Sequence, residues 1–394
     1  MSQSSNPDPQ STWIQFPGLT VQITIDSTAY DPSDLQWIDE NLSNLSCNPQ
    51  SQTTQLVSPK PLHLALTLCR NVANYQSLLA QRATFTLPTP CFSLHDKEIA
   101  TYSNPNLTNT IYDSELDVFY VSHSQHTDKV PHIEVIARTQ QPSARVAILR
   151  IVREFSSHCL IAKGWIPLHA SAVTFHDRAI LILGQRRAGK STLMLQLLRD
   201  FDCKFIANDR VFIDPIETPK PGVYPIPGVV NVRASSLALF PPQTTNTDAK
   251  CDLWSNVCSS WRARQTLAEA QAIHSSSSHP TLSDLSLSTH QYLHLVGSQQ
   301  VSFAPAALFV FPSQLTNTQS SWKPMSSVKL QSKLAENLFP ISSSAFLNHN
   351  PTQPCLTEVL QPLAQQVSGI ELQLECGKLA PPEILRSMLE QVLR

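Results

Sequence analysis

The amino-terminal part of the chain alternates short apolar stretches with turn-rich connections. Apolar or alternating β-branched residues predict strands at residues 19–25, 62–68, 118–121 and 133–136. Proline and asparagine mark the connections, as in residues 103–106. No set of residues with an evident catalytic role occurs in this part of the chain. Residues 1–140 therefore predict a smaller mixed α+β domain of unassigned role.

The central part of the chain changes to a different order of elements. We expect a long helix to open a second domain, followed by two neighbouring strands, a loop, a helix and a buried strand. The predicted ranges are a helix at 143–161, strands at 171–175 and 179–183, a helix at 193–198 and a strand at 203–207. A strand, loop, helix, strand order is typical of α/β nucleotide-binding units, so the predicted fold class is α/β.

The pattern becomes polar at about residues 241–300, which we interpret as an insertion or lid within a second domain spanning residues 141–394. Regular periodicity then returns. The predicted elements are strands at 306–311 and 370–374 and helices at 328–338, 356–367 and 382–393.

Composition narrows the classes of partner. Only 15% of the 394 residues are charged and the formal net charge is -2, without a run of basic residues, which excludes nucleic acid and an anionic membrane as partners. The start of the chain lacks the features of a secretion signal. Nine dispersed cysteines without a Cys-x-x-Cys pair favour a reducing cytoplasm and speak against a zinc site.

Directly after the predicted strand at 179–183, the chain matches the Walker A pattern: two glycines separated by four residues, then lysine and serine. Such a loop directs backbone N–H groups at phosphates, its lysine reaches the β- and γ-phosphates, and its serine hydroxyl binds Mg²⁺. The pattern predicts an ATP and Mg²⁺ site; a purely structural glycine turn is the alternative. The predicted nucleotide-binding residues are Gly184, Gln185, Arg186, Arg187, Ala188, Gly189, Lys190, Ser191 and Thr192.

A carboxylate follows the next buried strand of this unit. Asp209 stands two residues after the strand at 203–207, where an acid of the Walker B type meets Mg²⁺ or an attacking hydroxyl. Asp209 is therefore a candidate base or metal ligand. A helix cap or turn aspartate is the alternative interpretation.

Four segments of the chain resemble HPr kinase/phosphorylase and its relatives in order and approximate spacing. They are LHASAV at 168–173, the Walker A stretch at 184–191, ANDRV at 207–211 and GVVNV at 228–232. The resemblance is strong over about residues 144–236, weak over the rest of the carboxy-terminal region, and does not include residues 1–140. It implies a P-loop domain of the HPr-kinase/PEP-carboxykinase type that transfers the γ-phosphoryl group of ATP to a serine hydroxyl.

The same resemblance implies roles for single residues. The family places a histidine near the transferred phosphoryl group, and His169 occupies that position; taken alone, it reads as an ordinary core or surface histidine. The two adjacent acids of the family match Asn208 and Asp209. Asparagine cannot accept a proton, so Asp209 is the expected base. The Asn208 carbonyl oxygen can still bind Mg²⁺ together with Ser191 and Asp209, and the expected catalytic set is Asp209, His169 and Lys190.

The chain departs from the family just ahead of Gly228. The family carries an acidic residue and an arginine there, whereas this chain has Tyr224, Pro225, Ile226 and Pro227. This departure predicts an acceptor other than HPr: a serine of a different peptide or protein, or the hydroxyl of a small molecule. Whether the protein forms a homo-oligomer is left open.

Two functions remain on the sequence alone. The first is a kinase. Four arginines near the motifs could neutralise phosphate charge in it, or they are ordinary surface arginines: Arg186, Arg187, Arg210 and Arg233. The second is a catalytically silent nucleotide-binding regulatory or peptide-binding module, favoured by Asn208. The chain has no Asn-Lys-x-Asp sequence of a GTPase and no Leu-Ser-Gly-Gly signature of an ABC ATPase.

Overall fold

A computed structural model describes most of the chain. Every structural statement below refers to residues 10–16, 19–25, 32–42, 63–81, 86–94, 97–103, 110–123, 130–138, 143–216, 220–226, 228–233, 236, 284–316, 319–339 and 356–393. The chain divides into two compact units. We call the first, Met1–Leu160 with Pro340–Thr352, the amino-terminal unit, and the second, Ile161–Phe339 with Gln353–Arg394, the carboxy-terminal unit.

The amino-terminal unit is built on an eight-stranded sheet with the order β1-β2-β3-β8-β7-β6-β5-β4. The β2–β3 and β3–β8 pairs are parallel, and the other pairs are antiparallel. The strands are β1 (Gln10–Phe16), β2 (Leu19–Ile25), β3 (Leu64–Cys69), β4 (Thr86–Leu94), β5 (Lys97–Ser103), β6 (Thr110–Asp113), β7 (Val118–Ser122) and β8 (His132–Ile136), and the helices are α1 (Pro32–Leu42), α2 (Val72–Ala80) and α3 (Ser143–Ala162).

Helix α3 has the range that its periodicity predicts to within one residue, but Arg150 and Ser143 of this helix contact the amino-terminal unit. Arg150 forms ion pairs with Asp113 at 2.8 Å and with Glu115 at 2.7 Å, and the Ser143 hydroxyl donates to the Leu116 carbonyl. The contact-based division therefore falls after Leu160, twenty residues beyond the boundary expected after residue 140. An amphipathic pattern shows that a helix buries one face, but not which domain covers that face.

The carboxy-terminal unit is built on a nine-stranded mixed sheet. Its main path is β12-β10-β11-β17-β14-β13-β9, and β19 pairs with β17 and β18. The strands are β9 (Ile166–Leu168), β10 (Ala170–Phe175), β11 (Arg178–Leu183), β12 (Cys203–Ala207), β13 (Val211–Asp214), β14 (Gly222–Pro225), β17 (Ala304–Leu315), β18 (Ser321–Pro324) and β19 (Ser368–Glu375), and the helices are α4 (Lys190–Asp200), α8 (Thr289–Val296), α9 (Ser327–Glu336), α10 (Leu356–Gln366) and α11 (Pro382–Leu393).

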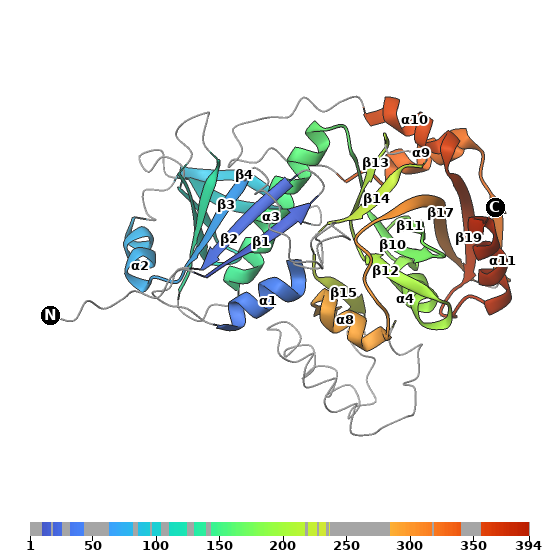
Figure 1. Cartoon of the computed structure of the whole chain (residues 1–394), viewed down its shortest axis with the longest axis horizontal. Coiled ribbons are helices and arrows are strands. Elements are labelled where there is room, and N and C mark those ends of the chain that lie inside the picture. The colour runs from blue at the N-terminus through green and yellow to red at the C-terminus, as the bar shows by residue number, and fades with distance from the viewer. Residues whose placement is uncertain are drawn as a thin grey trace, which may run out of the picture. The chain divides into compact units, whose positions relative to one another are not determined.

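Alternation along β11 explains the three layers of this unit (Figure 1). Ile180 and Ile182 join the core under α4, α8 and α11, whereas Leu181 and Leu183 join the core under α9 and α10. Successive side chains of a strand point to opposite faces, so a strand covered by helices on both faces must be apolar throughout. Helices thus cover both faces of the sheet, and the α/β class predicted from the sequence is confirmed at the level of a mixed α/β fold.

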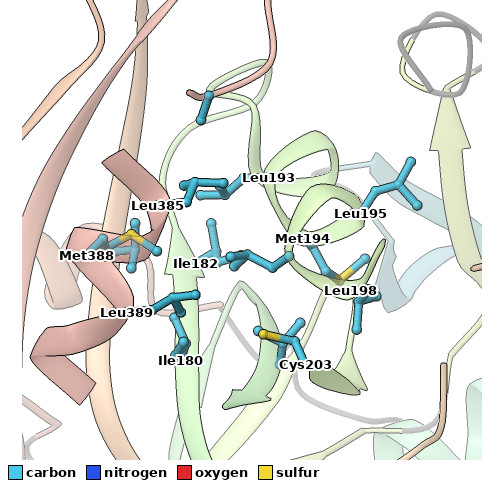
Figure 2. Close-up of a cluster of buried hydrophobic side chains, with 14 of the residues drawn as sticks. Ile180, Ile182, Leu193, Met194, Leu195, Leu198, Cys203, Leu385, Met388 and Leu389 are labelled. Carbon is cyan, nitrogen blue, oxygen red and sulfur yellow. The ribbon is translucent and has the colours of Figure 1, made fainter. Parts of the chain in front are cut away.

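The core beneath α4 holds that helix against β11. Figure 2 shows apolar side chains of α4 and α11 gathered around the two isoleucines of β11. The labelled residues are Ile180, Ile182, Leu193, Met194, Leu195, Leu198, Cys203, Leu385, Met388 and Leu389. This packing fixes the helix that follows the glycine-rich loop and therefore also fixes the end of the loop itself.

Part of the polar stretch at 241–300 belongs to the folded unit. Residues 284–287 form β16 (Asp284–Leu287), which pairs with β15 (Val230–Arg233), and α8 follows directly. Ser288 caps α8 in a capping box with Gln291, and Tyr292 is buried in the core. The Ser-x-x-Gln pattern is a helix-start signal that a purely hydrophobic criterion overlooks. Residues 241–283, including the helical fragment expected at 267–273, lie outside the described residues.

Strand directions place several strand ends at one edge of the carboxy-terminal sheet. Strand β10 is antiparallel to both β11 and β12, so those two strands point the same way, and β17 is parallel to β11 and to β19. The carboxyl ends of β11, β12, β17 and β19 therefore lie at the edge where β10 begins. This is the edge at which open α/β sheets bind ligands. Among the helices that the structure describes, none has the length and apolar character needed to cross a bilayer.

Candidate functional site

The glycine-rich loop at residues 184–189 connects β11 to α4. Three of its residues have left-handed backbone angles: Gly184 with φ 139°, Arg187 with φ 71° and Gly189 with φ 99°. Gly189 is the N-cap of α4 and, having no side chain, leaves the first N–H groups of the helix without a side-chain cap. Unpaired N–H groups at a helix start and left-handed turns both favour an anion.

Neighbouring groups crowd the loop at its last glycine. A Cβ atom on Gly189 would lie 3.3 Å from Nε2 of Gln314 at the carboxyl end of β17, and a Cβ on Gly184 would lie 3.4 Å from Cβ of Ala188. Gly189 therefore combines a left-handed angle with a close approach, whereas the contact at Gly184 is an ordinary van der Waals one. Gln185, Arg186 and Arg187 at the tip of the loop are exposed.

Lys190, the first residue of α4, folds back over the loop. Its Nζ atom donates hydrogen bonds to the carbonyl oxygens of Gly184 at 2.5 Å and Gln185 at 3.3 Å. Burial lowers the pKa of the Lys190 ammonium, and the negative charge of Asp209 acts in the opposite direction. The loop carbonyls thus hold an ammonium group within electrostatic reach of the predicted base.

The next two residues of α4 are half-buried. The Thr192 hydroxyl lies 3.0 Å from the Ser236 hydroxyl, a contact that the sequence did not indicate. Ser191 lies in the first turn of the helix, the position that the Walker A pattern gives to a Mg²⁺ ligand.

His169 and Asp209 form a pair at the same edge of the sheet. Nδ1 of His169 lies 3.3 Å from Oδ1 of Asp209, and the two side chains are 38% and 33% exposed. On its other oxygen, Asp209 has Nε of Arg210 at 3.5 Å, an ion-pair distance without hydrogen-bond geometry. The Asp209 carboxylate therefore has basic groups on both sides and retains access to solvent.

Asn208 links three of the segments that the sequence singled out. Its backbone carbonyl accepts a hydrogen bond from Ser171 at 2.5 Å, and its Nδ2 donates to the Asn231 carbonyl at 3.4 Å. Its Oδ1 is buried and accepts no hydrogen bond from the described part of the chain. A buried carbonyl oxygen without a donor is costly, and a cation is one way to satisfy it.

Two further residues near the site were not predicted from the sequence. Asn337, at the end of α9, accepts a hydrogen bond from the Gly184 N–H on its side chain and another from the His169 N–H on its backbone. Phe339 lies under the Arg210 guanidinium, 5.1 Å from ring centre to Cζ. Both are more than 120 residues from their partners in sequence, so no local pattern reports them.

The four candidate arginines differ in their surroundings. Arg186 and Arg187 are exposed at the loop tip, Arg210 contacts Asp209 and Phe339, and Arg233 is half-buried in β15. Within the described ranges, no group of three or more histidine, cysteine, aspartate or glutamate side chains is placed to hold a metal ion. A cation at this edge of the sheet would thus be coordinated by neutral oxygen atoms together with a single carboxylate.

The chain matches no protein-family model, and no curated protein shows significant sequence similarity to it.

Proposed function

We propose that this protein is a kinase of the HPr-kinase-like type, which binds Mg-ATP at the 184–189 loop and transfers the γ-phosphoryl group to a hydroxyl acceptor. The observation that carries the proposal is the His169–Asp209 pair at the same sheet edge as the loop, with the Lys190 ammonium within electrostatic reach of Asp209. A base beside a phosphate-binding loop is the arrangement that phosphoryl transfer requires.

The loop fits the phosphates of a nucleotide. Gly189 opens α4 without a side-chain cap, and Gly184, Arg187 and Gly189 have the left-handed angles of an anion-binding loop. The Lys190 hydrogen bonds to Gly184 and Gln185 are to neutral carbonyls, and a phosphate oxygen in their place would add the attraction between two opposite charges.

The side chains nearby fit Mg²⁺, which prefers hard oxygen ligands. The buried Oδ1 of Asn208 supports this because it lacks a hydrogen-bond donor among the described groups. Ser191, Asn208 and Asp209 would hold the ion between them. When bound, Mg²⁺ would neutralise charge on the phosphates during transfer.

The residues of the chain itself supply the proton chemistry. Asp209 would take the proton of the acceptor hydroxyl as the acceptor oxygen bonds to the γ-phosphorus and the bond to the β-phosphate oxygen breaks, leaving ADP. His169, 3.3 Å from Asp209, would hold the carboxylate in place. Arg210, on the other side of the carboxylate, would fix its second oxygen.

The acceptor we propose is a serine of a peptide or protein, or the hydroxyl of a small molecule. HPr itself is not proposed, because the segment ahead of Gly228 departs from the family; its first two residues, Tyr224 and Pro225, end β14, where Tyr224 pairs with Phe212 of β13.

A second function has one observation in its favour. Asp209 already lies between His169 and Arg210, and Asn208 stands where the family has a second acid. Asn208 leaves one carboxylate where the family has two, which favours a nucleotide-binding regulatory or peptide-binding module without transfer.

Label transfer from γ-labelled ATP to fractionated peptides and metabolites distinguishes the two functions. We expect Asp209→Asn to slow transfer by roughly 10²- to 10⁴-fold, the worth of a general base, while ATP affinity falls by less than about tenfold. Lys190→Ala should lose both binding and transfer. Asp177→Asn is the matched control, because this aspartate is 92% exposed in the β10–β11 turn.

Undiminished transfer by Asp209→Asn would remove Asp209 as the base. Tight ATP binding without a labelled acceptor in any fraction would favour the regulatory module instead.

A further inference from the structure

The residue that follows α9 ties the glycine-rich loop to His169. Asn337 is the C-cap of α9 and only 8% of it is exposed. Its Oδ1 accepts a hydrogen bond from the Gly184 N–H at 2.9 Å, and its backbone carbonyl accepts one from the His169 N–H at 2.8 Å. One residue therefore contacts the start of the loop and the residue before β10.

The Asn337 amide can adopt only one orientation. Its Nδ2 donates to the Lys333 carbonyl at 2.8 Å, one turn back in α9, so its Oδ1 must face the Gly184 N–H. The reverse orientation would place an NH₂ group against an N–H group and a carbonyl against a carbonyl. The helix thus fixes the direction of the acceptor, and the acceptor fixes the first peptide of the loop.

The two residues after Asn337 extend this connection to the predicted base. Leu338 pairs with Leu168 in an antiparallel bridge, and the Phe339 N–H donates to the Pro167 carbonyl at 3.4 Å. The Phe339 ring lies under Arg210, which flanks Asp209. Residues 337–339 therefore contact the loop, the His169 segment and the partner of Asp209.

Helix α9 is itself rigidly placed. Leu330 and Leu334 are buried in the core on the α9 and α10 face of the sheet. Gly369 of β19 packs so closely that a Cβ atom there would lie 2.8 Å from Leu330. Because the helix cannot shift freely, its C-cap can act as a fixed reference point for the site.

We propose that Asn337 is a positioning residue that holds the Gly184 end of the loop and His169 in a fixed relation, so that bound phosphates meet the His169–Asp209 pair. This proposal rests on the proposed nucleotide-binding function. In this proposal the Gly184 N–H donates its hydrogen bond to Asn337 and not to a phosphate. The N–H groups later in the loop are then the ones that donate to the phosphates. Preorganised donors bind and orient phosphate without reorganisation.

The first test uses the wild-type protein labelled with ¹⁵N-glycine, since the chain contains only nine glycines. Both amides are assigned in the wild type by pair labelling, because Gly184 is the only glycine that follows a leucine and Gly189 the only one that follows an alanine, so ¹³C-carbonyl leucine or alanine marks each in turn. We expect the Gly184 amide proton to exchange slowly, because it is hydrogen-bonded to a buried side chain, and the Gly189 amide to exchange faster without nucleotide. Equal, fast exchange at both glycines would overturn the proposal, whether or not any variant folds.

The second test compares Asn337→Ala, Asn337→Asp and Ser326→Ala. Ser326 caps the other end of α9 by accepting from the Lys329 N–H, so its loss weakens the same helix without touching the loop. Titration calorimetry with Mg-ADP should show affinity about three- to tenfold weaker in Asn337→Ala, the worth of one hydrogen bond, and unchanged in Ser326→Ala. In Asn337→Asp the retained oxygen should keep the Gly184 amide protected.

The outcomes separate this proposal from the proposed function. Wild-type affinity in Asn337→Ala, or an equal loss in Ser326→Ala, would overturn the positioning role. A weakened Asn337→Ala beside a wild type that binds Mg-ADP but labels no acceptor would support the positioning role and count against the kinase.

Discussion

Backbone angles at single residues decide whether the 184–189 loop can form. Gly189 combines φ 99° with a neighbour 3.3 Å from where a Cβ would lie, whereas Gly297, the C-cap of α8, has φ 67° and open space around it. Replacing either glycine by another residue would strain the backbone, but only Gly189 has a close neighbour. They therefore form a matched pair.

Gly189→Ala and Gly297→Ala should each reduce the free energy of unfolding by about 1–2 kcal/mol, because an L-residue is strained at these angles. Only Gly189→Ala should weaken Mg-ADP binding, by about tenfold or more, since the strained angle at the N-cap of α4 and the displaced Gln314 side chain both lie at the loop. Urea unfolding and titration calorimetry measure the two effects. Equal loss of ADP affinity in both variants would show that general destabilisation is the cause.

At the scale of residues, the sequence predicted contacts that are local or carried by a motif. The glycine-rich loop, Lys190 and the positions of His169 and Asp209 come from contiguous patterns, although their roles remain predictions. Asn337 was not found, because asparagine after a helix is an ordinary capping residue. Its partner Gly184 is 153 residues away in sequence, and only the fold shows that they meet.

At the scale of elements, the contact between β19 and α9 leaves no room for an additional carbon atom. A Cβ atom on Gly369 would lie 2.8 Å from Cδ1 and 3.1 Å from Cδ2 of Leu330. No side chain can enter this space unless the leucine moves, and the leucine lies in a filled core. This contact therefore sets the distance between the helix and the sheet.

Gly369→Ala should lower the free energy of unfolding by about 1–3 kcal/mol through overpacking. Leu330→Ala alone should cost about 2–5 kcal/mol by leaving a cavity. The double variant should lose less than the sum, because the new methyl group occupies part of that cavity. A urea-based double-mutant cycle measures the coupling, and strict additivity would contradict a direct contact.

The elements found from the sequence are those with strong periodicity. Strands β2 and β12 and helix α11 have the predicted limits, and α3, α4, α9 and α10 differ from theirs by a few residues. Strand β4 was missed because Pro88 and Pro90 interrupt it, which an edge strand tolerates. Helix α1 begins with Pro32, a good first residue of a helix, but its apolar positions are too few for its periodicity to stand out.

At the scale of the whole molecule, the two units differ in how they use charge. Asp34 in the amino-terminal unit is fully buried and forms ion pairs with Arg70 at 2.6 Å and Arg145 at 2.5 Å. Glu371 in the carboxy-terminal unit also has two basic partners, Lys323 and Lys329, but at the surface. We therefore expect the buried carboxylate to contribute more to the free energy of unfolding than the carboxylate at the surface.

Asp34→Ala should destabilise the amino-terminal unit by about 3–5 kcal/mol, because it leaves a buried guanidinium without its carboxylate. Glu371→Ala should cost less than about 1 kcal/mol, as expected for exposed pairs. Neither should change Mg-ADP affinity by more than about twofold, since one hydrogen bond to the ligand is worth more. Urea unfolding and calorimetry measure both. Loss of ADP affinity in Asp34→Ala would show that the amino-terminal unit contributes to the site.

The fold class of the chain could be predicted from the sequence at the level of a mixed α/β fold. A change from short strands to a strand, loop, helix order correctly indicated a mixed α/β chain. The sequence did not show that α3 packs with the amino-terminal unit, because Arg150, Asp113 and Glu115 are ordinary charged residues until the fold brings them together.

The hydrogen bond between Gly184 and Asn337 can form only late in synthesis of the chain, because its two partners are far apart in sequence. The loop, His169 and Asp209 are all synthesised before residue 210, but the helix that orients the loop is complete only at residue 336, and β19, against which that helix packs, follows at Ser368–Glu375. A nascent chain therefore carries the entire glycine-rich motif long before it can hold the motif in shape. Phosphate binding would then be acquired only after β19, which ends at Glu375, has been synthesised and has folded onto the sheet.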